Sequence, residues 1–467
     1  MNFKTLFKSL KNKDMLRRIA IVLGIIIIYR FMAHIPVPLG DPVTFKDAVT
    51  RLLSSSDLGS FINLISGGGL AAFSIILVGL SPYITASIVM QLITKVIPRL
   101  EELHNDGETG RRKINQWTRL ITVPLAILQS IAYIFILQKS VLAGATVDFV
   151  EPAMFDWIIS ITAMTTGSII LMWLGELITE QGIGNGISTL IFASIVSQMP
   201  KMFSQIGVSL FDTSAGGLEA FGWLYLPVNP TVFWIMLALG TAVIAVLYVL
   251  VKINEAQRIV TINYAKRVRG NRAYGGITSI LPMKLITAGV IPVIFAVAFL
   301  SLPAFVGQIM RSANWNPGFA DTLTTWFTAP SQQNFTGLSP EWFIYPIAYF
   351  LLVVAFTYFY TSIIFNTKEI SENLQKQGGF IEGVRPGQAT ITYLGRTMNR
   401  LNLFGSISLG LIAMLPFITD YIFIITTGAP IGLSLSGTGL LIVVTVGLEN
   451  IRQLNSRALM ITYDDYK

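Results

Sequence analysis

The sequence predicts an all-α integral membrane protein that crosses the bilayer with ten transmembrane helices. Hydrophobic residues make up 53% of the 467-residue chain and charged residues only 12%, whereas a soluble domain carries about 25% charged residues. Ten apolar segments approach or reach the length of a spanning helix, which is about 20 residues. Lysine and arginine are concentrated on one side of the membrane that these segments predict, as in polytopic proteins.

The ten apolar segments follow one another along the chain. They lie near Ile19–Pro36, Phe73–Ile97, Leu120–Leu137, Trp157–Leu174, Gly182–Met199, Val232–Val251, Leu285–Leu302, Trp342–Phe365, Phe404–Ile425 and Leu433–Leu448. The first follows a basic stretch and so has the look of a secretion signal. It is long enough to span, however, and no small-residue cleavage site follows it. We therefore expect it to be retained as the first helix.

Counting Lys and Arg gives the expected orientation. With the N-terminus in the cytoplasm, 27 of the 33 basic residues fall on the cytoplasmic side and five fall outside. Both termini are therefore expected to be cytoplasmic. The expected parts of the chain are a basic N-terminal tail (1–18), a first half with spans one to five (19–203), an external loop (204–230), a second half with spans six to ten (231–450) and a C-terminal tail (451–467).

Helix-breaking residues stand at corresponding places in the two five-helix halves. Residues 61–72, with the glycine run Gly67–Gly69, precede the second apolar segment, and Gly289 and Pro292 interrupt the seventh. Matching interruptions indicate an internal repeat around a central path. A re-entrant loop and a mild proline kink explain the same residues, so both interpretations stand at this point.

The residue content argues against enzyme and metal chemistry. The chain has no cysteine and only two histidines, His34 and His104, so a metal site would lack its usual ligands. No phosphate-binding loop, zinc-protease motif or serine nucleophile elbow occurs, and no cofactor is expected. Ionisable residues are nearly absent from the middle of the apolar segments. This argues against the main alternative, an ion-coupled transporter of a small solute.

Two cytoplasmic connections, 253–284 and 366–403, are long and basic. Counted from Lys252, the first carries seven Lys and Arg residues against one acidic residue, Glu255. A positive-inside signal explains part of this charge. A docking surface for an acidic or phosphate-rich partner explains the remainder, because loops of over thirty residues exceed what topology needs.

Five sequence motifs, in this order and on these loops and apolar segments, resemble those of the SecY family, the channel subunits of the bacterial Sec translocase. They read GRRKINQWTR at Gly110–Arg119, LMWLGELITEQGIGNGIS at Leu171–Ser188, NYAKR at Asn263–Arg267, AGVIPVIFA at Ala288–Ala296 and GVRPG at Gly383–Gly387. The resemblance covers essentially the whole chain. It implies two pseudo-symmetric halves around a central hourglass pore, which a short plug closes on the outside.

The resemblance also implies three groups of site residues. They are a pore ring of Leu80, Ile84, Ile187, Ile191, Ile294 and Ile442, a plug with Phe61, Ile62, Leu64, Ile65, Gly67, Gly68 and Gly69, and a docking surface with Lys266, Arg267, Arg269, Arg272 and Arg385. By residue type alone the ring positions are ordinary packing residues. Positions four apart on a helix, such as Leu80 and Ile84, point the same way.

The implied function is a passive protein-conducting channel in the bacterial inner membrane, and not an enzyme. Unfolded preproteins would cross through it, and membrane proteins would leave sideways into lipid between the second and seventh spans. The implied partners are the small subunits SecE and SecG, the motor ATPase SecA, the ribosome through its rRNA, signal peptides, preproteins and membrane lipids.

The distribution of basic residues predicts which side of the membrane each connection occupies. A reporter fused after residue 229 should be active outside the cytoplasm, and one fused after residue 467 should be active inside it. Alkaline phosphatase and fluorescent-protein fusions measure these two outcomes. The opposite readout at either position would contradict the ten-span topology.

Overall fold

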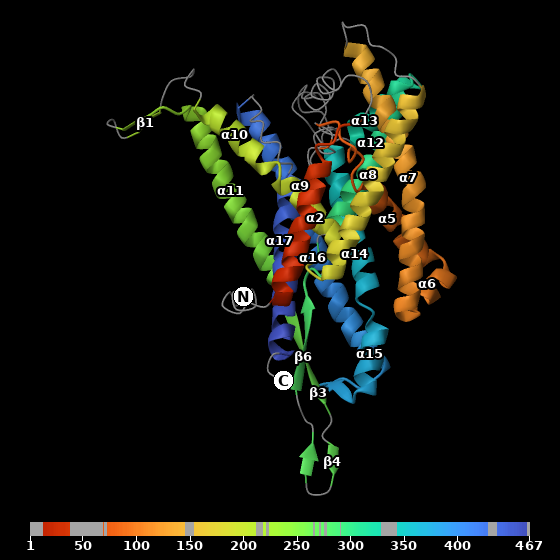
Figure 1. Ribbon diagram of the computed structural model, residues 1–467. Helices are drawn as coiled ribbons and strands as arrows, with labels where there is room; N and C mark the ends of the chain where they lie inside the picture. The colour runs from red at the N-terminus through yellow and green to blue at the C-terminus, as the bar shows by residue number, and fades with distance from the viewer. Residues whose placement is uncertain are drawn as a thin grey trace. The chain divides into compact units, whose positions relative to one another are not determined.

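The computed structural model describes residues 13–37, 69, 72–144, 154–211, 218–220, 224–264, 267–269, 272–274, 278–289, 291–327, 343–427 and 437–464. In these ranges the chain is built mainly of α-helices, with short antiparallel strands between some of them (Figure 1). It forms two compact units. The first comprises Met1–Ser209, Val297–Pro346 and Asp420–Lys467, and the second comprises Leu210–Ala296 and Ile347–Thr419.

The helices range in length from 8 residues to 40 residues. In chain order they are α2 (Lys13–Met32), α5 (Ser81–Val96), α6 (Pro98–Asn105), α7 (Gly107–Gly144), α8 (Met154–Gln181), α9 (Gly186–Val196), α10 (Met199–Leu210), α11 (Pro230–Glu255), α12 (Ile291–Ser312), α13 (Pro317–Phe327), α14 (Ile344–Ile364), α15 (Thr367–Lys376), α16 (Gln388–Thr427) and α17 (Gly437–Asp464).

Within the described residues, five helical stretches are long and apolar enough to cross a membrane. They are Gly107–Ile136, Met154–Gln181, Ile291–Arg311, Ile344–Lys376 and Gln388–Leu415. Each of the ten apolar segments predicted from the sequence overlaps one or more helices. The membrane-spanning helical class is therefore confirmed, while the number of ten spans stays a prediction.

Two helices begin later than their apolar segments, because backbone-bending residues precede them. α5 begins at Ser81 rather than near Phe73, after Gly79 with φ +63°. α12 begins at Ile291, after Gly289 with φ +64°. Pro292 therefore lies in the first turn of α12, where proline is tolerated. The interpretation of Pro292 as a kink within a helix is wrong.

The connection between α11 and α12, predicted only as a basic loop, contains β-structure. β3 (Gln257–Tyr264) is the middle strand of an antiparallel sheet, with β6 (Thr278–Lys284) on one side and β7 (Gly379–Ile381) on the other. β4 (Arg267–Arg269) pairs with β5 (Arg272–Tyr274) between β3 and β6, in the same connection, as Figure 1 shows. Since β7 comes from the second long connection, main-chain hydrogen bonds join the two basic loops.

A small apolar core fixes the base of this sheet. Val260, Met283 and Ile381, one from each strand, pack with Leu394 and Met398 of α16 and are at most 5% exposed. Side chains alternate between the two faces of a strand, so only one face of the sheet contributes to this core. The two basic connections are thus supported by a sheet whose one face is packed on α16.

Two further elements occupy connections for which the sequence predicts no secondary structure. β1 (Leu218–Ala220) pairs with β2 (Leu224–Leu226) in the connection between α10 and α11. α13 follows α12 after a turn of four residues, 313–316. The distribution of basic residues predicts that both connections are external.

Candidate functional site

The described part of the predicted plug region bonds to a segment that is itself paired with the residues just after α2. Gly69 is buried, and its carbonyl accepts a hydrogen bond from the amide of Ser74 at 2.8 Å. The amide of Val37 donates to the carbonyl of Phe73 at 2.9 Å, and that of Ile75 donates to Ile35 at 3.0 Å. The other named plug residues, Phe61, Ile62, Leu64, Ile65, Gly67 and Gly68, lie outside the described residues.

Residues 72–80 form a non-helical segment that packs against α8. A Cβ atom at Gly167 of α8 would lie 2.2 Å from the carbonyl oxygen of Ile75, so glycine alone allows this approach. The hydroxyl of Ser168 donates to the carbonyl of Gly79 at 2.9 Å. Irregular backbone at membrane depth is tolerated where protein surrounds it and satisfies its polar groups, and the Ser168 hydroxyl satisfies one carbonyl of this segment.

Leu80 and Ile84 stand where this segment becomes α5. Leu80 is the N-cap residue, and its carbonyl accepts the first helical hydrogen bond from the amide of Ile84 at 3.0 Å. The side chains are 3% and 5% exposed. These two predicted ring residues are therefore held at a helix start whose backbone position is set by α8.

Ile187 and Ile191 belong to α9, which crosses α8 at two glycines. A Cβ at Gly186 would lie 1.7 Å from the carbonyl oxygen of Gly175. Thr179 bridges the crossing: its hydroxyl accepts from the amide of Gly186 and donates to the carbonyl of Gly175, both at 2.9 Å. Ile191 is 2% exposed. Ile187 is half-buried, and its Cγ1 would lie 3.2 Å from a Cβ at Gly175.

Ile442 belongs to α17, which lies beside α9. Its side chain is 3% exposed. The amide nitrogen of Asn450 donates to the hydroxyl of Thr189 at 3.3 Å, and the side chain of Phe192 contacts the place where a Cβ of Gly447 would lie. The structure thus brings the ring positions of α9 and α17 onto adjoining helices. Ile294, 9% exposed, belongs to the second unit.

A cluster that sequence reasoning missed closes the end of α8. The carbonyl of Gln181 accepts hydrogen bonds from Arg18 of α2, at 3.2 Å, and from Arg457 of α17. Cations at the C-terminal end of a helix satisfy its free carbonyls and offset its dipole. Gly182 (φ +69°) makes room for the Arg457 guanidinium. The glycines of QGIGNG were the available signal, but their partners in α2 and α17 are remote in sequence.

The predicted docking residues lie on the sheet-supported loops of the second unit. Arg267, Arg269 and Arg272 belong to the β4–β5 hairpin, where Arg269 pairs with Arg272. Lys266 lies outside the described residues. Arg385 is exposed in the turn between β7 and α16, and its carbonyl accepts a hydrogen bond from the hydroxyl of Thr390 at 3.0 Å.

The chemistry of the described ring positions is that of aliphatic hydrocarbon. Among the described residues, no group of three or more acidic or histidine side chains could hold a metal ion. Long apolar helices, a non-helical segment packed inside them and a separate basic sheet define a polytopic α-helical membrane protein.

Comparison with known proteins identifies the family. The SecY family model matches residues 74–451. The protein translocase subunit SecY of Streptomyces coelicolor is 37% identical over 464 residues, which is 98% of each chain. The chain belongs to the SecY family. It is a protein translocation channel subunit of a membrane, and not an enzyme.

Two solved structures share the fold. One is a SecY protein whose plug domain stabilises the closed state of the translocation channel and maintains a membrane seal, with a TM-score of 0.58 and 19% identity. The other is Sec61 in the canine ribosome-channel complex from the endoplasmic reticulum, with a TM-score of 0.55 and 19% identity. Each match covers 93% of this chain and 90% of the other.

The glycine crossing of α8 and α9 predicts a position-specific loss of stability. Replacing Gly186 with alanine pushes a methyl group into the Gly175 carbonyl. Overpacking of this kind costs about 1–3 kcal/mol. Thermal unfolding of the purified protein in detergent should therefore shift to lower temperature.

Gly24→Ala is the matched control, because nothing lies within 4 Å of a Cβ at that helical position. It should leave the midpoint unchanged or raise it slightly, since alanine favours helix. Equal midpoints for Gly186→Ala and Gly24→Ala would show that the helices do not cross so closely.

Proposed function

We propose that this chain forms the passive pore through which unfolded preproteins cross the bacterial inner membrane and through which membrane proteins enter it. The pore is an hourglass between two pseudo-symmetric five-helix halves, 19–203 and 231–450, with ten spanning helices and both termini in the cytoplasm. The external loop 204–230 joins the halves. Family membership supports the general role, and the packing around α9 carries the proposal for the pore itself.

The neck of the pore is a ring of Leu80, Ile84, Ile187, Ile191, Ile294 and Ile442. The carrying observation is that adjoining helices α9 and α17 both offer aliphatic side chains at these positions and are held together by the Thr189–Asn450 hydrogen bond. An apolar neck offers an ion no ligand in place of its water, so it resists ions. Aliphatic side chains also adapt to many passing sequences.

A plug within residues 61–72 seals the pore from outside, and a lateral gate lies between α5 and α12. Support for the plug comes from the anchored end of this segment at Gly69 and from the sealing plug of the SecY structure with the same fold. Support for the gate comes from α5 and α12 themselves. Each begins with a proline in its first turn, after a glycine with left-handed φ. Signal peptides and membrane lipids meet at this gate.

The cytoplasmic loops 253–284 and 366–403 dock partners that supply energy or substrate. Their basic residues rise from one packed sheet, which holds Arg385 and the β4–β5 hairpin on a common base. The SecA motor and the ribosome, through phosphates of its rRNA, are the proposed partners. Sec61 of the same fold is found in a ribosome-channel complex. SecE and SecG are the proposed membrane subunits.

Loss of the apolar seal should turn the resting channel into an ion conductor. Serine in place of Ile84, Ile187 and Ile191 should wet the neck, because hydroxyls replace hydrocarbon. Planar bilayer recordings of the reconstituted triple variant should show conductance well above that of the parent. Removal of residues 61–72 should also raise resting conductance, through loss of the plug.

The control is serine at three buried aliphatic positions of α7 and α8, Ile134, Leu171 and Ile178. This variant should lose stability without leaking. If the folded triple variant conducts no more than the parent, the proposed neck is refuted. Its residues would then serve only in packing. Loss of solute uptake without conductance would favour the transporter alternative.

Charge reversal at Arg385 should weaken docking while sparing the fold. The residue is exposed, and exposed charges contribute little to stability. Binding of SecA or ribosomes to Arg385→Glu vesicles should fall severalfold, and the Lys266→Glu, Arg267→Glu pair should act in the same direction. Co-sedimentation measures the affinity.

Lys368→Glu, an exposed reversal on α15 in the same connection, is the matched control. If docking depends on position, Lys368→Glu should bind nearly as the parent does. Undiminished binding by both Arg385→Glu and the Lys266–Arg267 double variant would place the docking surface elsewhere.

A further inference from the structure

The α12–α13 hairpin folds back on itself at one face of the membrane. α12 ends at Ser312, and Asn314 and Asn316 take left-handed φ values of 52° and 47° in the turn. α13 then returns along α12. A Cβ at Gly307 would lie 2.9 Å from Leu323 of α13. Gly307 is more than one turn before the end of α12, so α13 lies at the depth of the last turns of a spanning helix.

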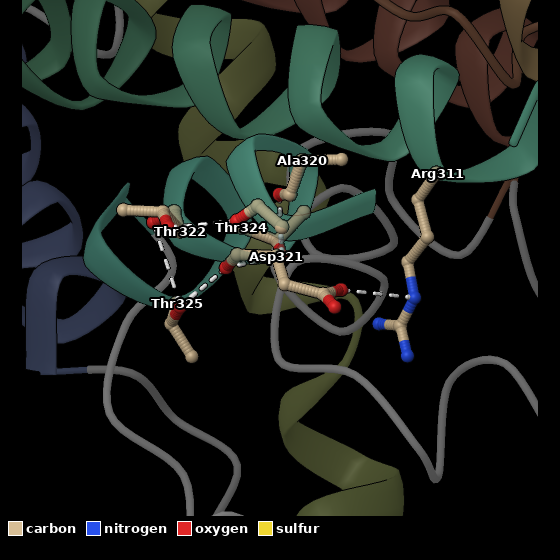
Figure 2. A network of polar contacts seen from close by, with 7 residues as sticks. Arg311, Ala320, Asp321, Thr322, Thr324 and Thr325 are labelled. Atoms are coloured by element: carbon tan, nitrogen blue, oxygen red, sulfur yellow. Dashed lines mark hydrogen bonds and ion pairs between the residues drawn. The ribbon is translucent and has the colours of Figure 1, made fainter. Parts of the chain in front are cut away.

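One side of this hairpin is polar. The Arg311 guanidinium of α12 and the Asp321 carboxylate of α13 form an ion pair at 3.5 Å, and both side chains are well exposed. The hydroxyl of Thr325 donates to the carbonyl of Asp321. Figure 2 shows Arg311 reaching toward Asp321 across the two helices, with the threonine hydroxyls close by. Asp321 and Thr325 therefore mark the polar side of α13.

The other side of the hairpin is apolar and exposed. Phe319 and Trp326 are two turns apart on α13, hence on one side of it, and are 53% and 40% exposed. Ala320, fully buried, lies on the face that packs on α12. That packed face separates the aromatic pair from Asp321.

The aromatic pair continues an apolar surface of α12. Phe299 and Val306, also two turns apart, are 43% and 48% exposed within the membrane-spanning stretch. Successive residues of a helix are rotated by about 100° around its axis. Seen along α12, Val306 therefore lies to one side of Gly307, which contacts α13, and Arg311 lies to the other side. Val306 and the aromatic pair thus share the side away from the ion pair.

We propose that α13 is an interfacial helix whose Phe319 and Trp326 insert at the boundary between lipid headgroups and acyl chains, in the leaflet where α12 ends. Aromatic rings are enriched at that depth, and the apolar side of an amphipathic helix is buried at the boundary between headgroups and acyl chains. The surface binds lipid because it continues the exposed hydrocarbon of a spanning helix, while the ion pair on its other side stays in water. α13 thereby anchors the outer end of α12.

The test uses the absence of cysteine from the sequence. A nitroxide is attached to Phe319→Cys or, as the matched control, to Thr325→Cys in the full chain. The chain is purified with its accompanying subunits and reconstituted in phosphatidylethanolamine–phosphatidylglycerol vesicles. Collisions with oxygen, which concentrates in lipid, are compared with collisions with a water-soluble nickel chelate. The oxygen-to-nickel ratio should be severalfold higher at position 319 than at position 325.

Two results would overturn the proposal. Equal ratios at the two positions would mean that both sides of α13 face water. Low accessibility to both reagents at position 319 would mean that a protein, either a partner or a second copy, covers the aromatic side.

A second set of variants tests whether the aromatic rings hold the helix in place. A label at Thr322→Cys, between Phe319 and Trp326, should lose its oxygen preference severalfold when both are replaced by alanine. Trp326→Phe, which keeps an aromatic ring, should retain it. An unchanged ratio in the alanine pair would show that α12 alone sets the depth of α13, and would refute the anchoring role.

Discussion

The constraint on which the structure depends is that backbone polar groups away from water need partners within the protein. Helices satisfy this need by themselves, which is why they make up most of the chain. Residues 72–80 cannot do so, since they are not helical. Hydrogen bonds to Ile35 and Val37, which follow α2, to Ser168 of α8 and between residues of the segment supply partners to several of their amides and carbonyls. The start of α5, with Leu80 and Ile84, is positioned by these bonds.

Close helix approach follows from the same constraint. Burying apolar side chains gives helices little reason to associate when the surrounding lipid is equally apolar, so packing at small residues and hydrogen bonds across helices hold them together. The Gly175–Gly186 crossing, with Thr179 bridging it, is one such contact. The Thr189–Asn450 hydrogen bond extends the set to α17. Polar neighbours thereby help to hold α9 and α17, with their aliphatic residues, side by side.

The sequence was sufficient for some features and insufficient for others, for physical reasons. Hydropathy located a helix under each apolar segment, because spanning helices bury long runs of one residue class. It misplaced the start of α5, since apolar residues fill 72–80 as they would fill a helix, and only Gly79 and Pro82 marked the boundary. The β3–β6–β7 sheet was missed because its strands come from two distant connections. The partners of Gln181 lie 163 and 276 residues away, which no local pattern reports. The ring, plug and docking residues came from the family resemblance, because aliphatic residues in a helix and basic residues in a loop carry no local signal of a pore or a docking surface.

The Gln181 carbonyl has a consequence for the making of the protein. It binds Arg18 of α2 and Arg457 of α17. A ribosome adds Arg18 to the growing chain long before it adds Arg457. A polypeptide released before residue 457 therefore leaves this helix end half-capped, however well its earlier helices have folded. Complete capping of α8 therefore depends on a residue that is synthesised long after α8 itself.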